Sequence, residues 1–223
     1  MKKNTHTNKN VTTIVNIVLD KSASMGSCRE GTIEGFNSYI KKLKEEDANI
    51  LVSLTLFDTG VQKRYSLIPI KEVALLDYSS YAPSGCTALW DAAVDSTEEC
   101  YERTKGMIEN KPAILSVIIT DGEENSSRRH ERECMNDLVE KLQGEGNWSF
   151  IYLGANQDSW SNASKVGMSM GNVANFRSND DGMRSTFSAM AMATSDLSLS
   201  ASKGIMRSSS LLSKVKGENN ELT

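Results

Sequence analysis

The chain contains 223 residues, of which 39% are hydrophobic and 24% are charged, and its formal net charge is −4. This length suits one α/β domain, and the ordinary composition excludes a disordered or fibrous protein. The acidic balance argues against a nucleic-acid-binding protein, which normally carries a concentrated basic face.

The cysteines and the amino-terminal sequence bear on the compartment. The 4 cysteines form no Cys-x-x-Cys pair, so we expect reduced thiols and no zinc knuckle. The apolar run at 11–19 is interrupted by Thr and Asn and lacks a small-residue cleavage site. We therefore expect no signal peptide and no membrane span, and we predict a cytoplasmic protein.

Hydrophobic periodicity predicts that strands and helices alternate along the chain. A buried strand is expected at 11–19, followed by an amphipathic helix from about Arg29 to Glu46. A second strand at 50–58 and a tight turn lead into an antiparallel return at 61–70.

The second half of the chain continues this alternation. A loop at 79–86 precedes a long helix, one face of which is expected to carry Leu89, Ala93, Thr97, Cys100, Thr104 and Met107. Further strands are expected at 113–120, 148–154 and 173–176, and further helices around 135–142, 157–166 and 183–197. We assign 11–203 to a single domain, between a disordered N-terminal tail at 1–10 and a flexible C-terminal tail at 204–223.

Repeated strand–helix units favour a mainly parallel sheet with helices on both faces, and such sheets bind ligands at the carboxyl ends of their strands. Asp20 ends the first strand, and Asp121 follows the strand at 113–120. If the strand order reverses between these two strands, the two carboxylates meet there. They would repel each other unless a cation held them. Thr87, just before a helix, could add a third polar group.

Three short elements carry a resemblance to a known family. Asp20-Lys21-Ser22-Ala23-Ser24 resembles the Asp-x-Ser-x-Ser element of the von Willebrand factor type A (vWA) family. Residues 84–92 resemble the threonine loop of that family, and Thr120-Asp121-Gly122 resembles its aspartate loop. The resemblance covers roughly residues 11–200. It implies a doubly wound, mainly parallel six-stranded α/β sheet of order 3-2-1-4-5-6, with one antiparallel edge strand and helices on both faces.

The resemblance also implies a metal-ion-dependent adhesion site (MIDAS). Its metal ligands would be Asp20, Ser22, Ser24, Thr87 and Asp121. Hard oxygen ligands suit Mg²⁺, and Mn²⁺ or Ca²⁺ are possible. The expected partner is another protein that presents an Asp or Glu carboxylate, and no catalysis is expected. Segments 150–160 and 171–190 resemble small bacterial and phage-encoded vWA proteins, whereas the sequence does not indicate the oligomeric state.

Several alternatives remain open at this stage. Asp20, the two serines and Thr87 could cap helices, and Asp121-Gly122 could form an ordinary turn. A metal-dependent hydrolase or phosphatase on a similar sheet would need a base, for which Lys21 and the two glutamates Glu123 and Glu124 are candidates. A third possibility is a structural metal, with recognition through the segment at 208–216. We expect Asp91 to be a structural hydrogen-bonding residue and both glutamates to be solvated.

Overall fold

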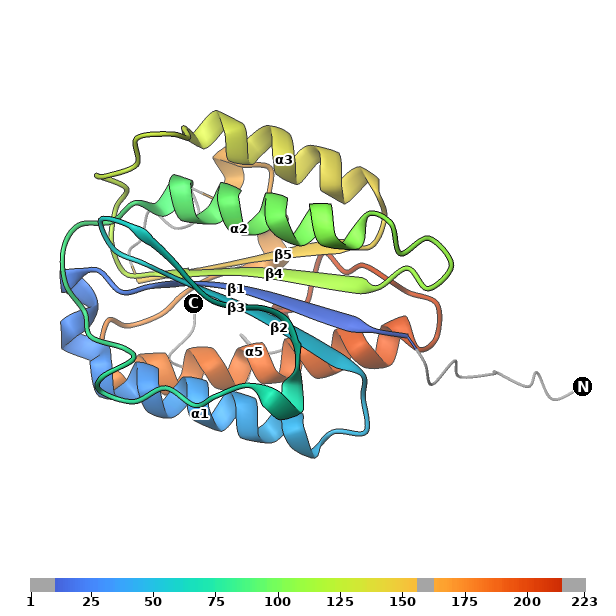
Figure 1. The fold of residues 1–223 in the computed structure, drawn as a ribbon, viewed down its shortest axis with the longest axis horizontal. Helices are drawn as coiled ribbons and strands as arrows, with labels where there is room; N and C mark the ends of the chain where they lie inside the picture. The colour runs from blue at the N-terminus through green and yellow to red at the C-terminus, as the bar shows by residue number, and fades with distance from the viewer. Residues whose placement is uncertain (1–10, 156–162, 214–223) are drawn as a thin grey trace, which may run out of the picture.

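The computed structural model describes residues 11–155 and 163–213 (Figure 1). Its strands are β1 (Thr13–Asp20), β2 (Ile50–Phe57), β3 (Val61–Pro69), β4 (Ala113–Thr120), β5 (Trp148–Gly154) and β6 (Val173–Asn175). Its α-helices are α1 (Arg29–Glu45), α2 (Leu89–Thr104), α3 (Arg132–Gly144) and α5 (Asp180–Ala201). Short 3-10 helices span Ala23–Cys28, Ile70–Glu72 and Met170–Asn172.

The six strands form one sheet in the order β3-β2-β1-β4-β5-β6. Strand β2 pairs antiparallel with β3, and all the other neighbouring strands run parallel. The expected fold class is therefore confirmed. The order reverses between β1 and β4, because β2 and β3 are added on one side of β1 whereas β4, β5 and β6 are added on its other side. A reversal of this kind is where open α/β sheets bind ligands.

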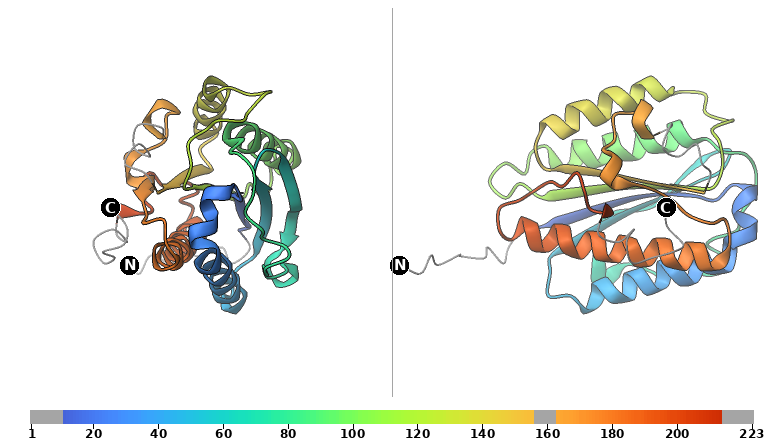
Figure 2. Two further views of the ribbon diagram at one scale, coloured as in Figure 1. Left: turned by 90° about the vertical axis from the view of Figure 1, so that its left-hand side faces the viewer. Right: turned by 180° about the vertical axis from the view of Figure 1, so that it is seen from behind.

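The sheet is covered on both faces, by α1 and α5 on one side and by α2 and α3 on the other (Figures 1 and 2). Strand β1 is buried along its whole length. Its residues alternate between the two layers, since Ile17 and Leu19 pack toward α1 and α5 whereas Ile14 and Val18 pack toward α2 and α3. An apolar run without a polar face is the sequence pattern that such a central strand requires.

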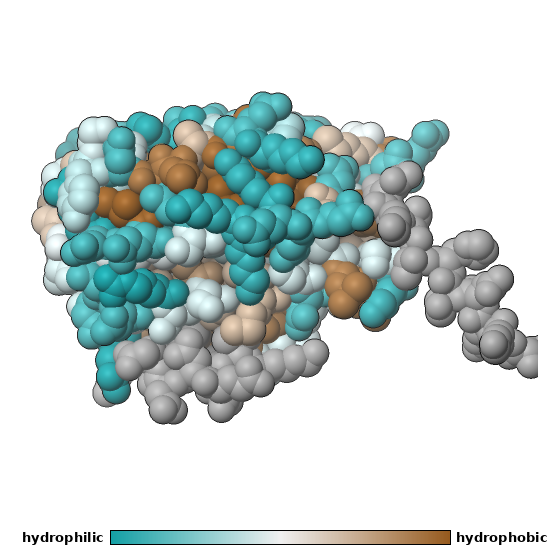
Figure 3. All heavy atoms as spheres, turned by 90° about the horizontal axis from the view of Figure 1, so that it is seen from below, coloured by the Kyte–Doolittle hydropathy of each residue, from teal (hydrophilic) through white to brown (hydrophobic). Residues whose placement is uncertain are grey.

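The outer surface of the molecule on the side of α1 and α5 is largely hydrophilic, with small apolar patches between polar side chains (Figure 3). Among the described residues, no helix combines the length and the apolar character that crossing a bilayer requires.

The structure corrects one helix boundary. Helix α2 ends at Thr104, so Met107 lies in the turn that follows and is 37% exposed. Gly106 stands in this turn, and glycine is a poor helix former. The expected tail at 1–10 lies outside the described residues, as does most of the helix expected at 157–166.

The chain stays packed beyond the domain boundary expected at residue 203. Leu211 is 6% exposed and Leu212 is fully buried in the core on the side of α1 and α5. The backbone N–H of Leu211 donates to Asn172 Oδ1 at 2.7 Å, and that of Leu212 donates to the Gly171 carbonyl oxygen at 3.1 Å. The folded part of the chain therefore continues through Ser213, and only 214–223 of the expected tail lies outside the described residues.

Candidate metal centre

The structure brings all five predicted ligands to one edge of the sheet. Asp20 is the last residue of β1 and Asp121 directly follows β4, so both stand at the carboxyl ends of adjacent parallel strands. Ser22 lies directly before the first 3-10 helix, Ser24 lies within that helix, and Thr87 lies just before α2. This edge is at the left of Figure 1 and faces the viewer in the left-hand view of Figure 2.

Short hydrogen bonds connect these groups. The Ser24 hydroxyl donates to Asp121 Oδ1 at 2.6 Å, and the hydroxyl oxygens of Ser22 and Ser24 are 3.0 Å apart. The backbone N–H of Ser22 donates to Asp20 Oδ1 at 2.6 Å. The two serines of the Asp-x-Ser-x-Ser element therefore lie beside the aspartate loop, which follows the neighbouring strand β4.

Gly122 marks the point on which the remaining oxygens converge. A β-carbon placed on this residue would lie 3.0 Å from Thr87 Oγ1, 3.5 Å from Ser24 Oγ and 3.8 Å from Asp20 Oδ2. Any larger residue would push its side chain into this cluster of oxygens. The threonine loop is held in place by Asn125, whose Oδ1 accepts the Thr87 N–H at 2.9 Å and whose own N–H donates to the Thr87 carbonyl oxygen at 3.1 Å.

The two carboxylates of the site are both buried. Asp20 is fully buried and Asp121 is 8% exposed. Burial raises the pKa of Asp20 from 3.8 to about 6 against the opposing hydrogen bonds from Thr120 and Ser22, and the Asp121 carboxylate raises it further. The described residues hold no group of three or more His, Cys, Asp or Glu side chains suited to a metal. Two carboxylates with three hydroxyls are nevertheless a donor set that fits a hard divalent cation.

Three residues around the site were not predicted as part of it. The Thr120 hydroxyl donates to Asp20 Oδ2 at 2.6 Å, and the Ser178 hydroxyl donates to Asp121 Oδ2 at 3.0 Å. The Tyr81 hydroxyl donates to the Asp20 carbonyl oxygen at 2.7 Å. Thr120 belongs to the aspartate-loop pattern, but no local signal marks Ser178, which reaches the site from the loop between β6 and α5.

Comparison with known proteins gives matches among solved structures alone. No family model matches the sequence, and no curated protein sequence does either. A bacterial von Willebrand factor type A protein from Catenulispora acidiphila matches with a TM-score of 0.54 at 16% identity, over 82% of this chain and 42% of that one. This chain has the vWA fold.

Two further matches are structures described with a bound metal. Manganese-loaded TRAP protein from Plasmodium vivax matches with a TM-score of 0.52 and 18% identity, over 81% of this chain and 74% of that one. Proximal thread matrix protein 1 from the mussel byssus, with a zinc-occupied MIDAS motif, matches with a TM-score of 0.53 and 16% identity, over 86% of this chain and 46% of that one. The chain spans less than half the length of the first matched structures.

In this vWA fold the capping explanation fails for Ser22 and Thr87. The N-cap residue of α2 is Ala88, and that of α1 is Cys28. Ser22 does stand at the N-cap of the first 3-10 helix, but its side chain makes no capping hydrogen bond there. The hydroxyls of Ser22 and Thr87 therefore do not serve helix starts.

Asp91 has the structural role that we expected. Its carboxylate accepts the backbone N–H groups of Arg128, Arg129 and His130 at 2.9–3.0 Å. Burial opposes these bonds, but together they lower the pKa of Asp91. The carboxylate thus fastens the loop after β4 to α2.

The expectation that both glutamates are solvated is wrong for Glu124. Its carboxylate accepts the Trp90 N–H at 3.0 Å and the Ser126 and Ser127 N–H groups at 2.7 Å each. The first N–H groups of a helix have no acceptor within the helix, so a carboxylate near the start of α2 is favoured there. No sequence pattern indicated that Glu124 would lie at this position. Glu123 is exposed, as expected.

Lys21 is committed to another contact. Its ammonium group forms an ion pair with Asp58, and the Lys21 side chain is only 9% exposed. Asp58 also accepts the Gly60 N–H at 2.9 Å, so this carboxylate serves the turn between β2 and β3.

Proposed function

We propose that this chain is a metal-dependent protein-binding module that holds Mg²⁺ at the carboxyl edge of its sheet and captures an Asp or Glu carboxylate of a partner protein. One observation carries the proposal: oxygens of Asp20, Ser24 and Thr87 converge around the position of the missing β-carbon of Gly122. The Ser24 hydroxyl in turn contacts Ser22 and the buried Asp121 carboxylate. The metal ligands in this proposal are Asp20, Ser22, Ser24, Thr87 and Asp121.

The ligand types explain why such a site would bind a carboxylate. The two acids supply the negative charge that a divalent cation requires. The hydroxyls add further oxygen donors without adding more negative charge. A cation bound there supplies an open position for an oxygen ligand from outside the chain. The chain's own part is to orient its carboxylates, which the Thr120 and Ser178 hydroxyls do by donating to Asp20 and Asp121.

The choice of metal is part of the proposal. The matched TRAP structure is described as manganese-loaded, and the matched mussel protein as having a zinc-occupied MIDAS motif. These two structures support a divalent cation as the ligand of the candidate metal centre. We favour Mg²⁺ over Mn²⁺ or Ca²⁺ because the donors are few, hard and partly neutral, and Mg²⁺ retains several waters when one or two carboxylates bind it.

We propose a binding role and no catalysis. The side chains that a hydrolase could use as a base are engaged elsewhere: Lys21 pairs with Asp58, and Glu124 accepts backbone N–H groups at the start of α2. Glu123 is exposed to solvent. These contacts favour capture of a partner over hydrolysis.

The first experiment is calorimetric titration of the intact chain with Mg²⁺. Thr87→Val removes the candidate hydroxyl ligand while keeping nearly the same side-chain volume, and we expect it to weaken Mg²⁺ binding by roughly tenfold. Thr97→Val is the matched control, because Thr97 is fully buried in the middle of α2 and its hydroxyl makes no hydrogen bond within the described residues. Equal affinities in all three proteins would contradict the assignment of this site.

The second experiment tests carboxylate capture. A short acetylated peptide with one central aspartate is compared with the same peptide carrying asparagine, each titrated with and without Mg²⁺. We expect binding that needs both the aspartate and Mg²⁺ and that is lost in Thr87→Val. Mg²⁺ binding without preference for the aspartate peptide would instead indicate a structural metal, with recognition elsewhere in the chain.

A further inference from the structure

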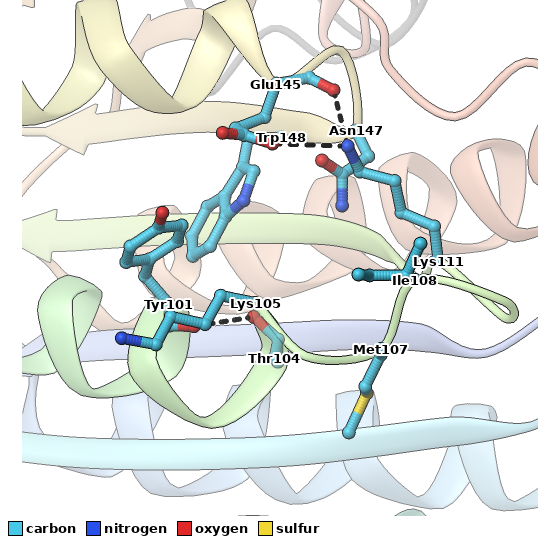
Figure 4. Close-up of a pocket in the computed structure, with 9 residues that line it drawn as sticks. All are labelled: Tyr101, Thr104, Lys105, Met107, Ile108, Lys111, Glu145, Asn147 and Trp148. Atoms are coloured by element: carbon cyan, nitrogen blue, oxygen red, sulfur yellow. Dashed lines mark hydrogen bonds and ion pairs between the residues drawn. The ribbon is translucent and has the colours of Figure 1, made fainter.

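A second candidate binding site lies at the opposite edge of the sheet, at the amino ends of β4 and β5. It is a cavity of about 280 Å³ between the end of α2, the loop before β4 and the start of β5 (Figure 4). Its wall includes Tyr101, Thr104, Met107, Ile108, Asn147 and Trp148. The candidate metal centre uses none of these residues. A cavity of this size is at the small end of ligand pockets and suits one side chain or a small molecule.

Asn147, which lines the cavity, carries a buried acceptor that receives no hydrogen bond within the described residues. The residue is 3% exposed, and its Nδ2 donates to the Pro112 carbonyl oxygen at 2.7 Å. That bond fixes which side of the amide carries the oxygen, because Pro112 can only accept. Asn147 Oδ1 is buried and receives no hydrogen bond from the described residues. An acceptor left in this state costs about 1–3 kcal/mol, which a ligand with a suitable donor would recover.

The apolar part of the cavity wall is formed by aromatic and aliphatic side chains, and its Trp148 ring is supported by a second ring. The Trp148 ring stacks on Phe150 with 5.8 Å between ring centroids. The rim carries the apolar side chains of Met107 and Ile108, which are 37% and 83% exposed. An isoleucine with this exposure beside a hollow gains free energy when a ligand covers it.

The charges at the rim are balanced within the protein. Lys105 pairs with Glu102, while Lys111 Nζ donates to the Glu145 carbonyl oxygen at 2.8 Å and lies 3.3 Å from Glu145 Oε2. Figure 4 shows the Lys111 side chain running past Asn147. This lysine is half-exposed and has room to turn aside. The balanced rim favours a neutral ligand over a charged one.

We propose that this cavity binds a hydrophobic side chain of a partner polypeptide together with a backbone amide N–H, which donates to Asn147 Oδ1. A peptide offers an apolar group and a neutral N–H donor within one residue, which matches both features of the site. Because the cavity and the metal centre lie at opposite edges of the sheet, the module would hold two partners independently.

The test uses the intact ¹⁵N-labelled chain and N-acetylphenylalaninamide as the probe, followed by NMR. We expect saturable shifts of the Trp148 indole and Asn147 side-chain signals, with a dissociation constant of about 1 mM for a ligand of this size. Ethyl 3-phenylpropanoate, which has the same ring but no N–H, is expected to bind about tenfold more weakly. Both results should be unchanged in EDTA, since the cavity contains no candidate metal ligand.

Two variants separate this site from non-specific binding. Ile108→Asp replaces an exposed apolar side chain at the rim and should weaken the probe about fivefold without affecting folding. Leu199→Asp is the matched control, because Leu199 is 56% exposed on α5, which covers the other face of the sheet. The proposal is overturned if the two signals do not shift, if the ester binds as tightly as the amide, or if both variants bind like the unmodified chain. A failure of Mg²⁺ binding would leave these results untouched.

Discussion

Replacing Asp20 with asparagine tests the reasoning on the metal centre, because it removes one charge and changes little else. The side chain is fully buried and accepts from the Ser22 N–H and from the Thr120 hydroxyl, each at 2.6 Å. An asparagine can still accept the Ser22 N–H with its oxygen and donate its amide to Thr120 Oγ1. The Thr120 hydroxyl can then donate to the Gly122 carbonyl oxygen, which already lies 3.2 Å away. No buried group is left without a partner.

The size of the effect follows from the buried charge. Burial raises the pKa of Asp20 from 3.8 to about 6, so the folded chain holds the proton more tightly than the unfolded chain does. Stability without metal therefore falls as the pH rises from about 4 to 6, and the whole cost is present at neutral pH. A shift of this size corresponds to about 3 kcal/mol. In EDTA, Asp20→Asn should raise the free energy of unfolding by up to that amount.

Mg²⁺ should act on the two proteins differently. At a concentration of about 100 times the dissociation constant, a ligand that binds only the folded state adds about 2.7 kcal/mol to the free energy of unfolding. We expect the unmodified chain to gain this amount and Asp20→Asn to gain little, so that the advantage of the variant largely disappears.

The assay is urea unfolding at neutral pH followed by circular dichroism, in EDTA and in excess Mg²⁺. A variant less stable than the unmodified chain in EDTA would show that the buried charge is compensated without a metal. Equal stabilisation of both proteins by Mg²⁺ would show that Asp20 is not a ligand.

Three further substitutions test the packing around the site, each by urea unfolding. Thr97→Val should raise the free energy of unfolding by about 1 kcal/mol, because it removes a buried hydroxyl that makes no hydrogen bond within the described residues. Leu212→Ala should lower it by about 3 kcal/mol, and an unchanged value would mean that the segment after α5 does not support the fold. Asn16→Leu should lower it by about 2 kcal/mol, since the Asn16 amide donates to Ser116 Oγ and accepts from the Ser96 hydroxyl inside the core. A gain in stability there would refute a stabilising role for this polar network.

The local sequence determined the elements and the residue types of the candidate site. The apolar runs of β1 and β4, each interrupted by one central polar residue, predicted buried parallel strands, because a strand covered on both faces has no side that faces solvent. The positions of Asp20 and Asp121 at the ends of β1 and β4 then predicted that their carboxylates would meet if the strand order reversed there, since parallel strands end at the same edge. The resemblance to the vWA family added Ser22, Ser24 and Thr87. Both predictions rest on short sequence patterns and on the expected topology of the sheet.

Tertiary structure alone decided the contacts between distant segments. Ser178 reaches Asp121 from 57 residues away in the sequence, and no local pattern marks it. Leu211 and Leu212 follow a polar stretch that reads as a tail, and only their contacts with the core show that they belong to the fold. No sequence pattern marks Asn147, whose side-chain oxygen is buried and receives no hydrogen bond within the described residues. Burial and hydrogen-bond partners depend on the whole packed chain, whereas strand and helix patterns depend on neighbours a few residues apart.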